Sequence, residues 1–239
     1  MNISKNLSLI NTAIIETAQM HSKDPATIKL VAVSKRHQVT AITEAIDSGQ
    51  TRFGENYIQE AAEKVSHFQD NIKFHFIGHI QSNKAKQAAE LFDMIETVDR
   101  FKLAKALNKH LEKIDRKIDI LIQVNIGNDP NKSGVLPEKA EELLQLIIPF
   151  KRLRPLGLMT IPPFETDNEK TRVHFRNLRL LGKRLADQQL FYNNDIFELS
   201  MGMSHDFKVA IEEGATIIRV GTAIFGARPD TIHKGAKTC

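Results

Sequence analysis

Lys35 is the residue of this chain whose type and position most directly suggest chemistry. It ends the run Lys29-Leu30-Val31-Ala32-Val33-Ser34-Lys35, whose apolar and β-branched residues are typical of a buried strand. An amine held at the end of a rigid strand, and partly desolvated there, loses its proton more readily and can attack an aldehyde. Taken alone, the peptide fits an ordinary solvated lysine better, so the interpretation depends on the rest of the chain.

Two later segments combine glycine with hydroxyl side chains, as many phosphate-binding loops do. Ser200-Met201-Gly202-Met203-Ser204 lies between a β-type run and a helical stretch, and Gly221-Thr222 follows the next β-type run. Glycine lets the backbone approach an anion, and the start of a helix offers free N–H groups with a favourable dipole. The alternative is that Gly202 serves a turn and Ser204 caps a helix. Two such loops in succession favour phosphate binding.

A third candidate, Arg219, stands inside the apolar run Thr216-Ile217-Ile218-Arg219-Val220. A buried arginine needs a partner. Two interpretations stay open. One is a structural ion pair with a carboxylate such as Glu55 or Glu198, and the other is contact with a ligand atom at the end of the strand.

The elements that must position these residues are short β-type runs alternating with helical stretches. The β-type runs lie near 30–34, 51–54, 72–77, 93–97, 119–126, 153–159, 196–200 and 216–220. The helical stretches cover 39–49, 57–67, 83–91, 100–115, 137–148, 166–188 and 204–213. Ahead of them, the spacing of Ile3, Leu7, Ile10, Ile14 and Ala18 predicts an additional first helix.

This alternation predicts parallel strands joined by helical crossovers. Eight such units favour a single (β/α)8 barrel of the TIM type over residues 1–239, with an extra N-terminal helix. An open doubly wound sheet is the alternative, although no Gly-x-Gly-x-x-Gly follows the first strand as a dinucleotide fold would require. Ligands of such barrels bind where the strands end, which would bring Lys35 and both glycine loops to one face.

Composition argues against several other classes of protein. The net charge of +4 comes from dispersed basic residues, and the chain has 2 tyrosines and no tryptophan, so we expect no nucleic-acid binding. No apolar run approaches the roughly twenty residues that cross a membrane. The only cysteine, Cys239, excludes an internal disulfide and a Cys/His metal site. We therefore expect a cytoplasmic protein without a signal peptide.

A series of motifs stands in order along almost the whole chain. They are Ala32-Val33-Ser34-Lys35, Phe53-Gly54-Glu55-Asn56-Tyr57-x-Gln59-Glu60, His75-Phe76-Ile77-Gly78, Gln81-x-Asn83-Lys84, Lys132-Ser133-Gly134, Gly157-Leu158-Met159, Ser200-Met201-Gly202-Met203-Ser204-x-Asp206-Phe207 and Arg219-Val220-Gly221-Thr222-Ala223-Ile224-Phe225-Gly226. In these motifs the sequence closely resembles the pyridoxal phosphate homeostasis protein family. His79 departs from the pattern, since members often have proline after that glycine.

The resemblance implies a barrel similar to the N-terminal domain of alanine racemase, the fold type III of proteins that bind pyridoxal 5′-phosphate (PLP). It implies that Lys35 holds PLP as an internal aldimine, that Arg219 faces the pyridine nitrogen and that Asn56 lies near the ring. The residues implied around the phosphate are Ser200, Gly202, Ser204, Gly221 and Thr222.

The resemblance further implies a protein that buffers or delivers PLP, with PLP-dependent apo-enzymes as recipients, and that influences amino-acid and keto-acid balance without turning over a defined substrate. We expect a monomer. An arginine at the pyridine nitrogen would oppose its protonation and leave a poor electron sink. Two alternatives are an amino-acid racemase, for which His79 or Tyr57 would supply a second acid/base, and an aldolase, for which no carboxylate base is evident near Lys35. His205 is expected on the first turn of a surface helix.

Overall fold

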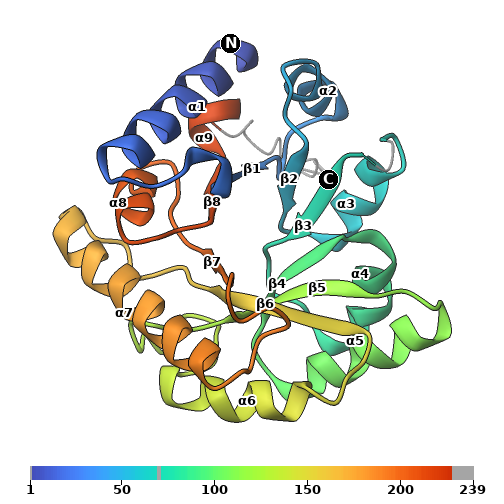
Figure 1. Ribbon diagram of the computed structural model, residues 1–239. Helices are drawn as coiled ribbons and strands as arrows, with labels where there is room; N and C mark the ends of the chain where they lie inside the picture. The colour runs from blue at the N-terminus through green and yellow to red at the C-terminus, as the bar shows by residue number, and fades with distance from the viewer. Residues whose placement is uncertain (1, 69–70, 228–239) are drawn as a thin grey trace, which may run out of the picture.

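Eight parallel strands close into one barrel in the computed structural model, which describes residues 2–68 and 71–227 (Figure 1). Each strand pairs with the next in the chain, and β1 pairs with β8 to complete the ring. The strands are β1 (Lys29–Val33), β2 (Arg52–Glu55), β3 (Lys73–Phe76), β4 (Met94–Val98), β5 (Ile118–Gln123), β6 (Leu153–Met159), β7 (Glu198–Ser200) and β8 (Ile217–Val220). The predicted TIM-type barrel is confirmed, and the open sheet is excluded.

Helices follow the strands and form the outer ring. They are α2 (Val39–Asp47), α3 (Ile58–Val65), α4 (Ala85–Leu91), α5 (Phe101–Lys113), α6 (Ala140–Ile147), α7 (Asn168–Asp187), α8 (Phe207–Glu212) and α9 (Thr222–Phe225), with short 3-10 turns η1 (Pro25–Thr27), η2 (Ser82–Lys84) and η3 (Pro137–Lys139). The helix α9 was not predicted, because its four residues are too few to show helical periodicity.

The additional N-terminal helix is confirmed as α1 (Ile3–Met20), which carries the predicted apolar stripe on its buried face. Asn2 caps it by accepting a hydrogen bond from the backbone N–H of Lys5 at 2.8 Å. α1 packs against α2 on one side and against α8 and α9 on the other, so the two ends of the described chain lie side by side (Figure 1). The Asn6 side chain joins them by donating to the carbonyl of Ile224.

Two predicted boundaries were wrong for identifiable reasons. The strand expected over 119–126 ends at Gln123. Val124 still donates to the carbonyl of Met159 in β6, but it also forms a bridge with Val135, and the backbone N–H of Asn125 donates to Val135 and no longer to β6. The helix expected over 204–213 begins only at Phe207. The residues before it form a turn, in which the Asp206 carboxylate accepts from the N–H of Met203 at 2.5 Å.

Alternate residues of each strand point into the barrel or out toward the helices. In β1, Leu30 and Ala32 belong to the large apolar core beneath the helices, whereas Val31 belongs to a small cluster inside the barrel with Met94, Leu121, Met159 and Ile217. Lys35 continues the inward series of β1, two residues beyond Val33. Arg219 has the inward parity of Ile217 in β8. The barrel therefore turns both residues toward the same interior.

The strands β6 and β7 approach each other closely at Gly157, which has no side chain. A Cβ on Gly157 would lie 2.0 Å from the backbone oxygen of Glu198, so only glycine permits this approach.

Two further expectations concern membrane spans and metal sites. Among the described residues, no helix has both the length and the apolar character to cross a membrane, and no cluster of three or more His, Cys, Asp or Glu could hold a metal. Cys239 and the end of the predicted 1–239 domain lie outside the described residues.

Candidate functional site

A cavity of about 200 Å³ opens at the carboxyl ends of the strands. Six of the eight predicted site residues line it: Lys35, Asn56, Ser204, Arg219, Gly221 and Thr222. Its other lining residues are Val33, Ile77, Ile161, Met203 and His205. The barrel therefore brings the amine, residues of both glycine–hydroxyl loops and the buried arginine to one place, as predicted.

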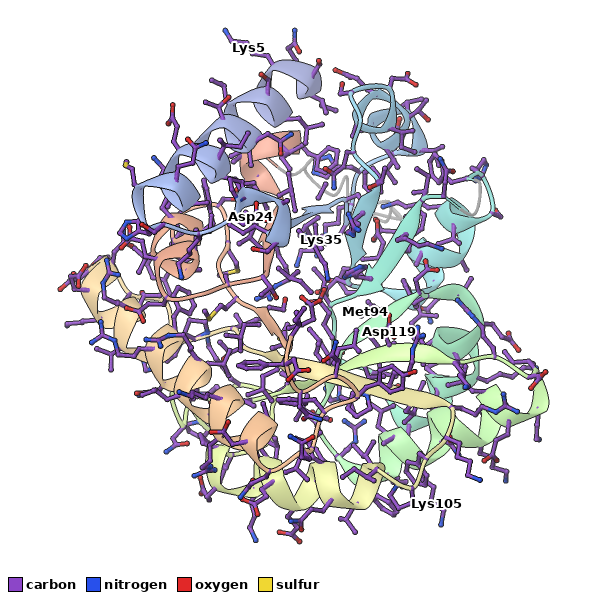
Figure 2. All side chains as sticks on the ribbon, in the orientation of Figure 1. Lys5, Asp24, Lys35, Met94, Lys105 and Asp119 are labelled. Carbon is purple, nitrogen blue, oxygen red and sulfur yellow. The ribbon has the colours of Figure 1, made fainter. Side chains whose placement is uncertain are left out.

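Lys35 lies over the barrel opening, at the end of β1, rather than at the molecular periphery (Figure 2). In the same view the surface lysines Lys5 and Lys105 point outward from α1 and α5. Lys35 is half-buried, and its Nζ lies 3.4 Å from Oδ1 of Asn56, which follows β2. Its amine thus faces a cavity that combines apolar walls with hydrogen-bonding groups.

One buried amine, that of Lys64 in α3, holds the backbone directly before Lys35 and, through Glu60, directly after it. Lys64 Nζ donates to the carbonyl oxygen of Ser34 at 2.8 Å, just before Lys35. It also donates at 2.6 Å to Glu60, whose carboxylate accepts from the backbone N–H of Arg36, just after Lys35. Arg36 has a φ of 65°, a left-handed conformation that these contacts stabilise. Lys64 therefore fixes the backbone from which the Lys35 side chain projects.

The same amine neutralises Glu55, a fully buried carboxylate at the end of β2. Lys64 Nζ lies 2.8 Å from Oε1 of Glu55, and that oxygen also accepts from the Ser34 hydroxyl at 2.6 Å. The other oxygen, Oε2, is buried without a hydrogen-bond partner. Burial raises the pKa of Glu55, and Lys64 and Ser34 only partly offset that rise. We call Lys64, Glu55 and Glu60 the Lys64 clamp.

The phosphate-type loops meet at the far side of the cavity, where the Thr222 hydroxyl donates to Ser204 Oγ at 3.2 Å. α9 begins at Thr222, so its first N–H groups lack intrahelical acceptors and remain available to an anion. Gly202 does not line the cavity. It has a φ of 91°, and a Cβ there would lie 2.5 Å from Cβ of Ala210, so its role is to turn the loop tightly over α8.

Ser200 does not line the cavity either, so the structure places it apart from the other residues predicted at the phosphate. Its side chain is fully buried at the inward end of β7. Its hydroxyl donates to Oε2 of Glu96 at 2.5 Å and accepts from the guanidinium of Arg219. Strand alternation turns Ser200 into the barrel interior, whereas Ser204 lies beyond the strand end and reaches the rim.

Arg219 lines the cavity and is almost fully buried. It donates to the carbonyl of Thr160 at 2.7 Å, and its Nη1 lies 3.7 Å from Oε2 of Glu96. The interpretation of a buried ion pair with a carboxylate is confirmed, but the partner is Glu96 and not one of the two carboxylates suggested, Glu55 and Glu198. Glu55 belongs to the Lys64 clamp, and Glu198 pairs with Lys29 at the amino-terminal ends of the strands.

Glu96 was missed by the sequence analysis. The available signal was a carboxylate at an inward position of the apolar β4 run, Met94-Ile95-Glu96-Thr97-Val98. Burial opposes ionisation of Glu96, but a hydrogen bond and charge from His75, together with Arg219 and Ser200, outweigh it, so the pKa of Glu96 is lowered. Burial lowers the pKa of Arg219, and Glu96 and Asp206 oppose that change.

The two residues predicted as a possible second acid/base lie outside this cavity. Tyr57 is exposed, with its ring beside the guanidinium of Arg36. His79 lines a neighbouring cavity, where its Nδ1 lies 3.4 Å from the hydroxyl of Ser133. His205 does line the Lys35 cavity, so its expected place on a surface helix was wrong. It belongs to the turn that precedes α8.

The neighbouring cavity shares Asn56, Ile77 and Ile161 with the first. It also contains Lys132, whose amine donates to the carbonyls of Ile161 and Pro162. Desolvation lowers the pKa of Lys132. The mouth of the barrel therefore presents a second amine, which any labelling experiment must distinguish from Lys35.

Comparison with known proteins gives a clear relationship. Residues 12–229 match the family described as alanine racemase, N-terminal domain. The pyridoxal phosphate homeostasis protein of Haemophilus influenzae is 42% identical over 232 residues, covering 95% of this chain and 97% of that one. The chain belongs to the pyridoxal phosphate homeostasis protein family. The family predicted from the motifs is thereby confirmed.

Solved structures of this family share the fold. PipY of Synechococcus elongatus PCC7942, in a structure with PLP bound, is 34% identical with a TM-score of 0.81, over 94% of this chain and 100% of that one. The structure of PipY without PLP gives 36% identity and a TM-score of 0.82, with the same coverage. Alanine racemase from Corynebacterium glutamicum is 16% identical with a TM-score of 0.69, and this chain covers 62% of it, so it shares the barrel fold.

The Lys64 clamp predicts a pH-dependent stability defect in Lys64→Met. Removing the amine leaves Glu55 buried without its cation, which should cost about 3–5 kcal/mol in the free energy of unfolding near neutral pH. In the wild type Lys64 lowers the pKa of Glu55 against the effect of burial, so without the amine this pKa rises further above 4.5, and the folded variant holds the Glu55 proton more tightly than the wild type or the unfolded chain does. The cost should therefore grow as pH rises from about 5 to about 8, as measured by urea unfolding.

The matched control is Lys73→Met, which removes an exposed partner of Asp93. It should change the unfolding free energy by less than about 1 kcal/mol at either pH. A Lys64→Met defect that is equal at both pH values would contradict the assigned coupling to Glu55.

Proposed function

We propose that this protein binds PLP covalently, as a Schiff base on Lys35, and that it buffers or delivers the cofactor rather than turning over a substrate. The observation that carries the proposal is that one cavity brings together the half-buried amine of Lys35, the buried guanidinium of Arg219 and a rim of phosphate-type loops. We call this rim, formed by Ser204, Gly221 and Thr222, the phosphate-type rim. Relatives of 42% identity bear the name pyridoxal phosphate homeostasis protein, and PipY has been solved with PLP bound, which supports the choice of ligand.

The residues present fit this group. When bound, PLP supplies an aldehyde that an amine can capture and a ring that can accept electrons from an attached amino acid. Lys35 provides the amine, held by the Lys64 clamp on a fixed backbone. Ser204, Thr222 and the first N–H groups of α9 would provide donors for the phosphate. Asn56 lies beside the amine, and we assign it to the ring.

Arg219 gives a physical reason for carriage without catalysis. Its guanidinium is the group we assign to the pyridine nitrogen, where a positive charge opposes protonation of the ring. A ring that stays unprotonated withdraws electrons weakly, so the α-carbon of an attached amino acid keeps its proton. The described lining residues also contain no carboxylate to serve an aldolase, and neither Tyr57 nor His79 reaches the cavity.

The wider role follows from the same features. A cofactor held on one lysine, in a cavity open at the barrel mouth, can pass to an amine of another protein by exchange of the imine. We therefore propose PLP-dependent apo-enzymes as recipients. We also propose that the carrier is a cytoplasmic monomer. Control of free PLP would in turn influence the amino-acid and keto-acid balance that PLP enzymes maintain.

Borohydride reduction tests the covalent site. The purified protein incubated with PLP should be yellow, and reduction should leave the cofactor on the peptide that contains Lys35, as read by mass spectrometry. Lys35→Ala should lose the visible band. Lys132→Met, which removes the neighbouring amine, should keep it. Label on Lys132 alone in the wild type would disprove the assignment.

Comparing the binding affinities of PLP and pyridoxal tests the phosphate-type rim. Each charge-assisted hydrogen bond to the phosphate is worth roughly 1.5–3 kcal/mol, so pyridoxal should bind at least about tenfold more weakly. Thr222→Val should weaken the binding of PLP, measured by fluorescence titration, and leave that of pyridoxal unchanged. Equal dissociation constants for the two aldehydes would contradict a phosphate site at this rim.

Hydrogen exchange tests the absence of turnover. In deuterated water, the PLP-loaded wild type should exchange the α-hydrogen of common amino acids no faster than free PLP does, followed by NMR. Efficient exchange or racemisation would support the racemase alternative. The acid/base would then be sought first at His205, because it lines the Lys35 cavity, and His205→Asn should abolish that exchange.

A further inference from the structure

We propose that Glu96 is a positioning residue for this site: it holds the guanidinium of Arg219 in place and offsets its charge, and thereby sets how strongly this guanidinium opposes protonation of a ligand in the cavity. The inference rests on the proposed function of Lys35 and Arg219. It concerns a residue that does not line the cavity and acts only through Arg219.

The geometry places Glu96 at the centre of a buried network. Its Oε1 lies 2.7 Å from Nδ1 of His75, and its Oε2 accepts from the Ser200 hydroxyl at 2.5 Å. That hydroxyl accepts in turn from Arg219, whose Nη1 lies 3.7 Å from Glu96 Oε2. The four residues come from β3, β4, β7 and β8. Glu96 therefore connects Arg219 and Ser200, on β8 and β7, to His75 on β3.

The charges around Arg219 make Glu96 its principal counterion. Glu96 is the carboxylate within ion-pair distance of Arg219 among the described residues, and it is fully buried. Asp206 also acts on Arg219, but its Oδ1 accepts from the N–H of Met203. The cavity side of Arg219 holds the amine of Lys35.

The barrel interior contains further titratable groups on the side of Glu96 that faces His75. His75 lies against Glu96, and His75 and Lys29 both act electrostatically on Asp119. Lys29 is paired with Glu198, and Asp119 with Arg154 at 2.6 Å. In each of these two pairs the positive and negative charges balance each other. Loss of Glu96 would therefore leave the guanidinium of Arg219, which lines the cavity, without its carboxylate partner.

The sign of the effect follows from Coulomb attraction. Glu96→Gln keeps the size of the side chain and hydrogen-bonding atoms toward His75 and Ser200, but it removes the negative charge. The more positive cavity should disfavour the protonated imine on Lys35. The pH midpoint of the visible band should fall by on the order of one pH unit.

The experiment is a pH titration of the visible absorbance of the PLP-loaded protein, with PLP affinity and the melting temperature of the PLP-free protein recorded beside it. The wild type is compared with Glu96→Gln. The control is Glu213→Gln, which removes a buried carboxylate paired with Arg176 and Arg179 at the opposite end of α8 from Asp206. This control should leave the midpoint unchanged, even where it lowers the melting temperature.

Ser200→Ala provides a second variant in case Glu96→Gln does not fold. It removes the hydroxyl between Glu96 and Arg219 while both charges stay. PLP affinity should fall several-fold, with a midpoint close to that of the wild type. Wild-type affinity in Ser200→Ala would overturn the positioning role.

The outcomes separate the two proposals. A wild-type midpoint in a folded Glu96→Gln variant shows that Glu96 is only structural and overturns this inference, while the carrier function stands. A wild-type protein that takes up PLP without a visible band overturns the Schiff base on Lys35 and this inference with it. A lowered midpoint in Glu96→Gln but not in Glu213→Gln supports it.

Discussion

Alternate residues of every strand point into one narrow barrel interior, and the site depends on this constraint. The constraint turns Lys35 and Arg219 toward the same opening from neighbouring strands, β1 and β8. It also places Glu96 of β4 and Ser200 of β7 beneath the cavity instead of on the surface. A closed ring is needed for this convergence, because in an open sheet β1 and β8 would not be paired.

Burying these charges is costly unless each one has a partner, and the fold supplies partners in two separate groups. The Lys64 clamp serves the lysine end of the cavity, where it fixes the backbone before and after Lys35. Glu96, with His75 and Ser200, serves the arginine end. Each group uses a carboxylate that does not line the cavity, so the described lining residues offer a ligand one amine and one guanidinium but no acidic side chain.

That arrangement suits a protein that holds an aldehyde and gives it up intact. Catalysis on an attached amino acid requires an electron-withdrawing ring and a group that moves the α-proton. In the site proposed for PLP, Arg219 would work against the first requirement. The two candidates for the second, Tyr57 and His79, lie outside the cavity. The histidine that does line it, His205, stands beside Ser204 at the phosphate-type rim.

The sequence by itself determined the alternation of strands and helices, the position of Lys35 at the end of a strand and the glycine–hydroxyl loops at the rim. These features are local, since each depends on periodicity or on residues that are neighbours in the chain. Only the tertiary structure decided that Glu96, rather than Glu55 or Glu198, faces Arg219, that Lys64 anchors the backbone around Lys35 and that Ser200 is turned away from the cavity. The physical reason is that these contacts join different strands and helices. They depend on the relative stagger of the strands when the barrel closes, which no local pattern encodes.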